Sequence, residues 1–169
     1  INAVLTQQTD VVALTRYASK KGTDIRFIEM MPIGYGSSFT GMSQEKIVSL
    51  LEERFGRLVP YEGEPLGNGP CKYYIVKGFQ GKIGFISAIS HKFCSECNRI
   101  RLTSQGYLKT CLQYTAGRDL REVLRNGGTD EELKEIIKEA LSEKPDGHHF
   151  REKAKEDDTE SLCMAQIGG

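Results

Sequence analysis

The chain has 169 residues, 38% hydrophobic and 27% charged, a composition typical of one soluble globular domain. Its 23 basic and 23 acidic residues balance, which excludes attraction to nucleic acid or a membrane by overall charge. We therefore expect neither nucleic acid nor a membrane as a partner. We also expect a cytoplasmic location, because no segment has the pattern of a membrane span or secretory signal. The five cysteines, an odd number, argue against a disulfide framework and favour metal or redox chemistry.

The first part of the chain predicts a strand, a helix and a second strand, as in a parallel α/β unit. The sequence opens inside an apolar strand at residues 1–5, which suggests a piece of a longer protein. Apolar residues at helical spacing predict a helix over residues 11–18 that ends at Gly22. Residues 25–31 have the nearly continuous apolar character of a buried parallel strand, in which Glu29 needs a polar partner.

The middle of the chain predicts a helix and then antiparallel strands. Glycine and serine make residues 34–41 a loop, and an apolar stripe predicts an amphipathic helix over residues 42–55. Three glycines and three prolines mark residues 60–70 as a connector. Two strands are expected around a glycine-containing turn, at residues 73–76 and 82–89.

The last part predicts a second hairpin followed by helices. The hairpin strands are expected at residues 99–102 and 107–112, and a short helix at residues 119–125. Thr129 and Glu132 match a capping box ahead of a longer apolar stripe, which predicts another helix.

The chain then becomes strongly charged. Residues 142–160 predict an extended arm, in which His148 and His149 are expected to be exposed to solvent. Residues 161–169 are apolar again and end in two glycines.

The strongest chemical signal is a cysteine cluster. Cys94 and Cys97 are separated by two residues, and thirteen more residues lead to Cys111. The predicted hairpin would return Cys111 towards the first pair. Three thiolates suit an iron–sulfur cluster with one open iron. Alternatively, the residues form a structural zinc site or a set of idle thiols. A closed zinc site needs a fourth ligand, for which the candidates are His91, Cys71 and Cys163.

Two arginines follow the cysteine pair at alternate positions. On a strand, Arg99 and Arg101 would point to the same side, since successive side chains alternate between faces. Paired guanidiniums are well suited to bind the phosphates of a polyanion. They could also simply offset the charge of the thiolates.

Three segments of the sequence resemble motifs of a known enzyme family. The segments Phe93–Leu112 (FCSECNRIRLTSQGYLKTCL) and Arg26–Gly34 (RFIEMMPIG) and the end Ile167–Gly169 (IGG) resemble motifs of the GTP 3',8-cyclases. These are radical S-adenosylmethionine lyases of molybdenum cofactor biosynthesis. The similarity runs over essentially the whole chain in the same order.

The resemblance implies a fold and a reaction. Residues 1–41 would form the last strand–helix–strand part of an incomplete (βα)6 TIM-like barrel. Residues 42–169 would form an α+β region, with antiparallel strands and helices, that binds a [4Fe–4S] cluster and GTP. In the family, a radical made from S-adenosylmethionine at a first [4Fe–4S] cluster abstracts hydrogen from GTP, and the product is 3',8-cyclo-7,8-dihydro-GTP.

The resemblance also implies roles for particular residues. The ligands of the second, substrate-side [4Fe–4S] cluster would be Cys94, Cys97 and Cys111. GTP phosphates would be bound by Arg99 and Arg101, with Arg26 as a further basic residue at the substrate pocket. Met31 falls at an apolar contact to S-adenosylmethionine. Gly168 and Gly169 resemble a tail that enters the active site, where they would support catalysis.

One family motif is missing from this sequence. The CxxxCxxC signature that holds the first cluster does not occur, so we expect that cluster and most of the S-adenosylmethionine site to lie in an absent N-terminal half. The chain alone is therefore expected to be inactive. The family suggests a homodimer, with cyclic pyranopterin monophosphate synthase acting downstream. The competing interpretation is a zinc-binding or auxiliary-cluster module of another protein.

Overall fold

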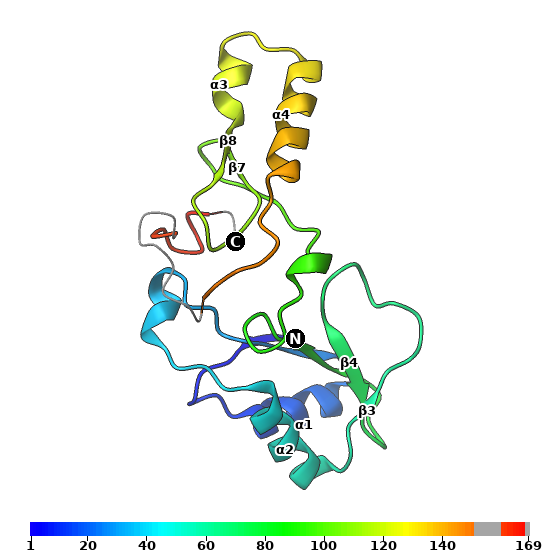
Figure 1. Cartoon of the computed structure of the whole chain (residues 1–169). Helices are drawn as coiled ribbons and strands as arrows, with labels where there is room; N and C mark the ends of the chain where they lie inside the picture. The colour runs from blue at the N-terminus through cyan, green and yellow to red at the C-terminus, as the bar shows by residue number, and fades with distance from the viewer. Residues whose placement is uncertain (151–159, 168–169) are drawn as a thin grey trace. The chain divides into compact units, whose positions relative to one another are not determined.

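The computed structural model describes residues 1–150 and 160–167, which form two compact units (Figure 1). Unit 1 comprises Ile1–Met31 and Ser38–Phe93, and unit 2 comprises Pro32–Ser37 and the residues from Cys94 onward. Across the residues described, no helix is long and apolar enough to span a bilayer. Strands from residues 42–93 join the same sheet as strands from residues 1–31. The domain boundary predicted after residue 41 stays a prediction.

Unit 1 is built on a five-stranded mixed sheet with the strand order β1-β2-β5-β4-β3. The first three strands in that order run parallel, and the last two pairings are antiparallel. The strands are β1 Asn2–Val4, β2 Ile25–Ile28, β3 Val59–Pro60, β4 Lys72–Ile75 and β5 Ile83–Ile86. The parallel strand expected after the first helix is confirmed, although it ends before Met31. Strand β3 was not predicted, because two residues that include a proline carry no strand pattern.

Two helices of unit 1 are confirmed together with the residues that begin and end them. Helix α1 spans Val11–Lys21, where Asp10 accepts a hydrogen bond from the Ala13 N–H at 2.8 Å. Gly22 ends this helix with φ 61°, a left-handed conformation that favours glycine. Helix α2 spans Gln44–Phe55 and begins after Ser43.

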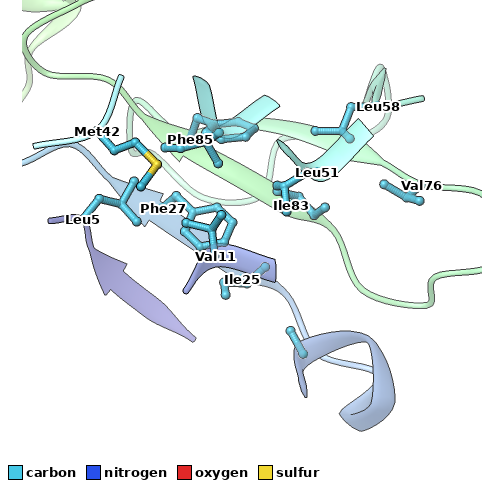
Figure 2. Close-up of a cluster of buried hydrophobic side chains, with 12 residues drawn as sticks. Leu5, Val11, Ile25, Phe27, Met42, Leu51, Leu58, Val76, Ile83 and Phe85 are labelled. Carbon is cyan, nitrogen blue, oxygen red and sulfur yellow. The ribbon is translucent and has the colours of Figure 1, made fainter. Parts of the chain in front are cut away.

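The core of unit 1 lies on one face of the sheet, where side chains of both helices meet the strands (Figure 2). Along β2 the side chains alternate: Ile25 and Phe27 are buried and Arg26 is exposed. Phe27 packs against Phe85 of the paired strand with ring centroids 6.0 Å apart. Leu51 of α2 is completely buried in the same cluster.

Unit 2 contains a three-stranded antiparallel sheet with the strand order β6-β7-β8 and two helices. The elements are β6 Arg101–Leu102, β7 Tyr107–Lys109, β8 Gly117–Asp119, α3 Leu120–Arg125 and α4 Asp130–Ser142. Short 3-10 helices occur at η1 Gly34–Ser38 and η2 Cys94–Glu96. Both helices and the capping box of Thr129 with Glu132 are confirmed, whereas β8 was not predicted. The predicted hairpin is present, but its strands are shorter than expected, so that Arg99 and Cys111 lie outside them.

The prediction that His148 is exposed in a charged arm is wrong. His148 is only 8% exposed, and its ring stacks against Phe150 with centroids 4.7 Å apart. The neighbouring His149 is exposed, as predicted, but its Nδ1 lies 2.6 Å from the Tyr114 hydroxyl. Polar contacts of His149 with Tyr114 and Gln113 hold this segment within unit 2, and the rings of His148 and Phe150 cover each other. Residues 151–159 of the predicted arm lie outside the described residues.

We expect Leu51→Ala to lower the free energy of unfolding of unit 1 by about 2–5 kcal/mol, because it leaves a cavity in a fully buried site. Glu53→Ala on the exposed face of the same helix should change it by less than about 0.5 kcal/mol. Urea denaturation followed by circular dichroism measures both variants. Equal midpoints for the two variants would contradict the assignment of Leu51 to the core.

Candidate functional site

The cysteine pair lies at the two ends of a tight turn. Cys94 begins η2, and the Cys97 N–H donates a hydrogen bond to the Cys94 carbonyl at 3.1 Å. Both cysteines and Cys111 are free thiols and partly exposed. The turn therefore holds Cys94 and Cys97 on one short segment, with no disulfide consuming them.

The following hairpin brings the chain back beside this segment. Strands β6 and β7 pair Arg101 with Lys109 and Leu102 with Leu108. Continuing the same register by two residues would set Cys111 opposite Arg99. Gly106 makes the turn with φ 82°, and its N–H donates to the Thr103 carbonyl at 3.0 Å. The predicted return of Cys111 towards the cysteine pair is thus supported by the strand pairing.

The three thiols have the donor chemistry that iron–sulfur clusters and zinc require. However, within residues 1–150 and 160–167 no three side chains of His, Cys, Asp or Glu lie close enough to hold one metal ion. Holding a metal would require Cys94, Cys97 and Cys111 to turn towards a common point. Their assignment as ligands stays a prediction, and so does the alternative of zinc.

The possible fourth zinc ligands are divided between the two units. Cys71 and His91 belong to unit 1, and Cys163 belongs to unit 2. Burial raises the pKa of the Cys71 thiol, although a hydrogen bond with Tyr73 and the charge of Arg26 act in the opposite direction. This thiol therefore favours its protonated form in the absence of a metal.

The electrostatics of Arg101 show that positive charge is concentrated beside the cysteines. Burial, and next the charge of Arg99, lower the pKa of the Arg101 guanidinium, while Cys97 acts in the opposite direction. The two guanidiniums are therefore close enough to repel each other, with Arg101 partly buried and Arg99 exposed. Such a pair attracts an anion with several negative oxygens.

Lys144 is a residue of this site that sequence reasoning missed. It follows α4, and its Nζ donates to the carbonyl oxygens of Cys97 at 2.6 Å and Arg99 at 2.9 Å. One ammonium thus fixes the backbone between the cysteine pair and the arginines. No sequence signal indicates this contact, because its acceptors are backbone groups more than forty residues earlier.

Arg26 and Met31 belong to unit 1, and the three cysteines of the motif belong to unit 2. Arg26 is exposed on β2 opposite Gly84, where a Cβ atom would lie 3.2 Å from the Arg26 Cγ and 3.1 Å from the Tyr73 Cε1. Glycine at position 84 thus leaves room for both longer side chains. Met31 is half-buried after β2. The roles predicted for Arg26 and Met31 stay predictions, and Gly168 and Gly169 lie outside the described residues.

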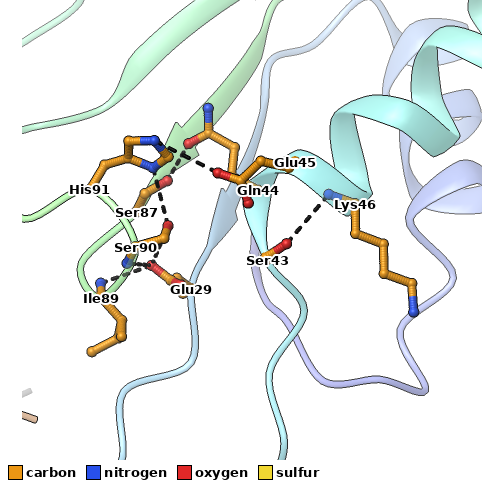
Figure 3. Close-up of polar contacts among 9 residues, drawn as sticks. All are labelled: Glu29, Ser43, Gln44, Glu45, Lys46, Ser87, Ile89, Ser90 and His91. Atoms are coloured by element: carbon orange, nitrogen blue, oxygen red, sulfur yellow. Dashed lines mark hydrogen bonds and ion pairs between the residues drawn. The ribbon is translucent and has the colours of Figure 1, made fainter. Parts of the chain in front are cut away.

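Glu29 has the polar partners that its position requires (Figure 3). One of its carboxylate oxygens accepts hydrogen bonds from the N–H groups of Ile89 and Ser90, both at 2.8 Å, and from the Ser90 hydroxyl at 3.1 Å. Beside it, the Ser87 hydroxyl donates to the side chain of Gln44 at the start of α2. These bonds fix the segment that follows β5 against the end of β2.

Comparison with known families identifies the chain. Residues 23–150, which include the cysteine motif and its two arginines, match the family model described as Molybdenum Cofactor Synthesis C. The chain belongs to the Molybdenum Cofactor Synthesis C family. The match argues against the interpretation of the chain as a module of an unrelated protein.

Individual relatives of this Molybdenum Cofactor Synthesis C chain are named GTP 3',8-cyclase. This chain is 44% identical over 173 aligned residues to the GTP 3',8-cyclase of Clostridium perfringens (strain 13 / Type A). The alignment covers 100% of this chain and 52% of that protein. The GTP 3',8-cyclase of Hydrogenovibrio crunogenus is 39% identical, covering 97% of this chain and 50% of that protein. That of Pelotomaculum thermopropionicum is 38% identical, covering 96% and 49%. The chain spans about half the length of the relatives it matches.

We expect Lys144→Met to lower the free energy of unfolding of unit 2 by about 1–3 kcal/mol, because two carbonyl oxygens lose a charged donor. Lys138→Met is the matched control, since Lys138 forms a pair with Glu135 on the exposed surface of α4, and such pairs contribute little. Chemical denaturation compares the two variants. If both behave like the unsubstituted protein, the Lys144 contacts do not stabilise the site.

Proposed function

We propose that this chain is the part of a GTP 3',8-cyclase that binds GTP and the second [4Fe–4S] cluster. The whole protein would convert GTP to 3',8-cyclo-7,8-dihydro-GTP, the first step of molybdenum cofactor biosynthesis. The observation that carries the proposal is the place of Arg99 and Arg101, close enough for one charge to act on the other, between the cysteine pair and the turn of the hairpin that leads back towards Cys111. Relatives named GTP 3',8-cyclase support the choice of substrate.

The proposed roles follow from side-chain chemistry. Cys94, Cys97 and Cys111 would hold the cluster as thiolates, and three protein ligands leave one iron able to bind a group of the substrate. Arg99 and Arg101 would bind the phosphates, since guanidiniums form paired charged hydrogen bonds with phosphate oxygens. Together they would orient GTP, with the purine towards the cluster and the phosphates towards the arginines.

Unit 1 would be the end of the incomplete (βα)6 barrel. Its three parallel strands, with both helices packed on one sheet face, support this assignment. The first cluster and most of the S-adenosylmethionine site would lie in the rest of the protein, with Met31 contacting S-adenosylmethionine and Arg26 near the substrate. Gly168 and Gly169 would reach the active site. A homodimer and a downstream cyclic pyranopterin monophosphate synthase belong to the same proposal.

We expect Arg99→Ala and Arg101→Ala each to weaken GTP binding by the whole protein about tenfold to a hundredfold, the effect of losing a charged hydrogen bond of about 1.5–3 kcal/mol. Guanosine, which lacks phosphates, should bind the variants and the unsubstituted protein equally. Titration calorimetry measures both ligands, and Arg125→Ala at the end of α3 is the control. An equal loss of guanosine binding would indicate damage to the fold, and unchanged GTP affinity would exclude the phosphate role.

Metal analysis tests the proposed cluster. Reconstitution of the whole protein without oxygen should yield about four irons, with sulfide, beyond those of the first cluster. Cys94→Ala, Cys97→Ala and Cys111→Ala should each lose these irons, while Cys71→Ala and Cys163→Ala should keep them. Bound zinc that is lost in the same three variants would instead establish the structural zinc alternative.

A further inference from the structure

The hairpin that carries Arg101 also carries a buried lysine. The Lys109 and Glu160 side chains are only 2% and 5% exposed, and they form an ion pair. The Lys109 ammonium also donates to the Tyr114 carbonyl at 2.8 Å. Lys109 is paired with Arg101 across the hairpin and lies two residues before Cys111. The ion pair therefore joins the hairpin of the candidate site to a residue fifty-one positions later.

A buried ion pair is a weak source of stability, because removing both charges from water offsets most of their attraction. Hydrophobic side chains of similar volume often stabilise a fold as well or better. An ion pair instead favours the one chain conformation in which the two charges meet, since either charge left alone in the interior is strongly unfavourable. The Lys109–Glu160 pair is therefore best understood as fixing where Glu160 lies.

Further contacts hold the chain around Glu160 at this place. The Glu160 N–H donates to the carbonyl of Gln113 at 2.6 Å, and the side chain of Gln113 accepts a hydrogen bond from the His149 N–H. Gln113 is almost completely buried. The Glu160 carboxylate also accepts from the Leu162 N–H at 2.8 Å. Glu160 is thus fixed through its backbone and both carboxylate oxygens.

The residues after Glu160 form a compact turn. The Cys163 N–H donates to the Gln166 side chain at 3.0 Å, and the Gln166 N–H donates back to the Cys163 carbonyl at 2.9 Å. Gly34, with φ 52°, lies against this turn so closely that a Cβ atom there would be 2.8 Å from the Cys163 Cα. Ile167 is completely buried. Gly168 and Gly169 follow Ile167 directly in the sequence.

We propose that Lys109 and Glu160 are positioning residues that hold the C-terminal segment, residues 160–167, on the hairpin of the candidate site. The inference rests on the proposed function, in which Gly168 and Gly169 take part in turnover. Neither Lys109 nor Glu160 needs to touch GTP. Their ion pair fixes the position of residues 160–167 relative to the hairpin that carries Arg101 and leads to Cys111.

The test uses the whole protein and four variants. Lys109→Met and Glu160→Gln each remove one charge, and the double variant Lys109→Met/Glu160→Met removes both while keeping side-chain volume. Lys134→Met is the control, because its pair with Glu131 lies on the exposed surface of α4. Hydrogen exchange of residues 160–167 measures the seating, and kcat/KM for GTP, GTP affinity and iron content measure the site.

We expect faster hydrogen exchange of residues 160–167 in both single variants and in the double variant. The control variant should exchange at the rate of the unsubstituted protein. In the same three variants kcat/KM should fall about tenfold or more, because misplacing a group near the reacting atoms by about 1 Å can cost about a hundredfold. GTP affinity and iron content should stay within about twofold of the unsubstituted protein, the range that separates a positioning defect from lost binding.

Two results would overturn the proposal. Unchanged exchange in the single variants would show that the pair does not seat the segment, and normal exchange with normal turnover in the double variant would show that packing alone does so. If the unsubstituted protein binds GTP and iron but does not convert GTP, the proposed function fails, while the exchange measurements still decide whether Lys109 and Glu160 seat the segment.

Discussion

The parallel pairing of β2 with β1 and β5 is the constraint on which unit 1 depends. Because β2 is paired on both sides, its register decides which residues face the helices. Phe27 is paired with Phe85 and packs into the core, while Arg26 is paired with Gly84 on the opposite face. The same pairing brings the carboxyl ends of β2 and β5 together, where Glu29 binds the Ser90 segment. A one-residue slip would move Arg26 into the core and separate Glu29 from its donors.

Unit 2 is organised by polar contacts more than by strands. Its strands are two or three residues long, too short to define a rigid sheet alone. Two lysines supply the missing constraints: Lys144 binds the backbone of the cysteine–arginine segment, and Lys109 binds Glu160. Long ammonium side chains suit this task because each can serve several carbonyl or carboxylate oxygens at once. The position of the cysteine motif therefore depends on charges distant in sequence.

Local sequence patterns predicted most of the helices and strands. The features that these patterns missed depend on contacts between residues distant in the sequence. Helix α4 was predictable because the apolar spacing and the capping box of Thr129 agree. Strand β3 was not, since a two-residue strand has no period, and it exists because β4 offers it a partner. His148 lies in a polar sequence, yet its ring is buried beside Phe150. For the site, spacing alone singled out the cysteines and arginines, whereas the contacts of Lys144 could not be read from it.

The charges beside the cysteines bear on both explanations of the arginine pair. Cys97 acts to raise the pKa of the Arg101 guanidinium, as expected if the arginines offset thiolate charge. Burial and the charge of Arg99 act more strongly in the opposite direction, so that the pKa of Arg101 is lowered. An anion with several oxygens would relieve both the repulsion and the loss of hydration, which supports the proposed phosphate-binding role.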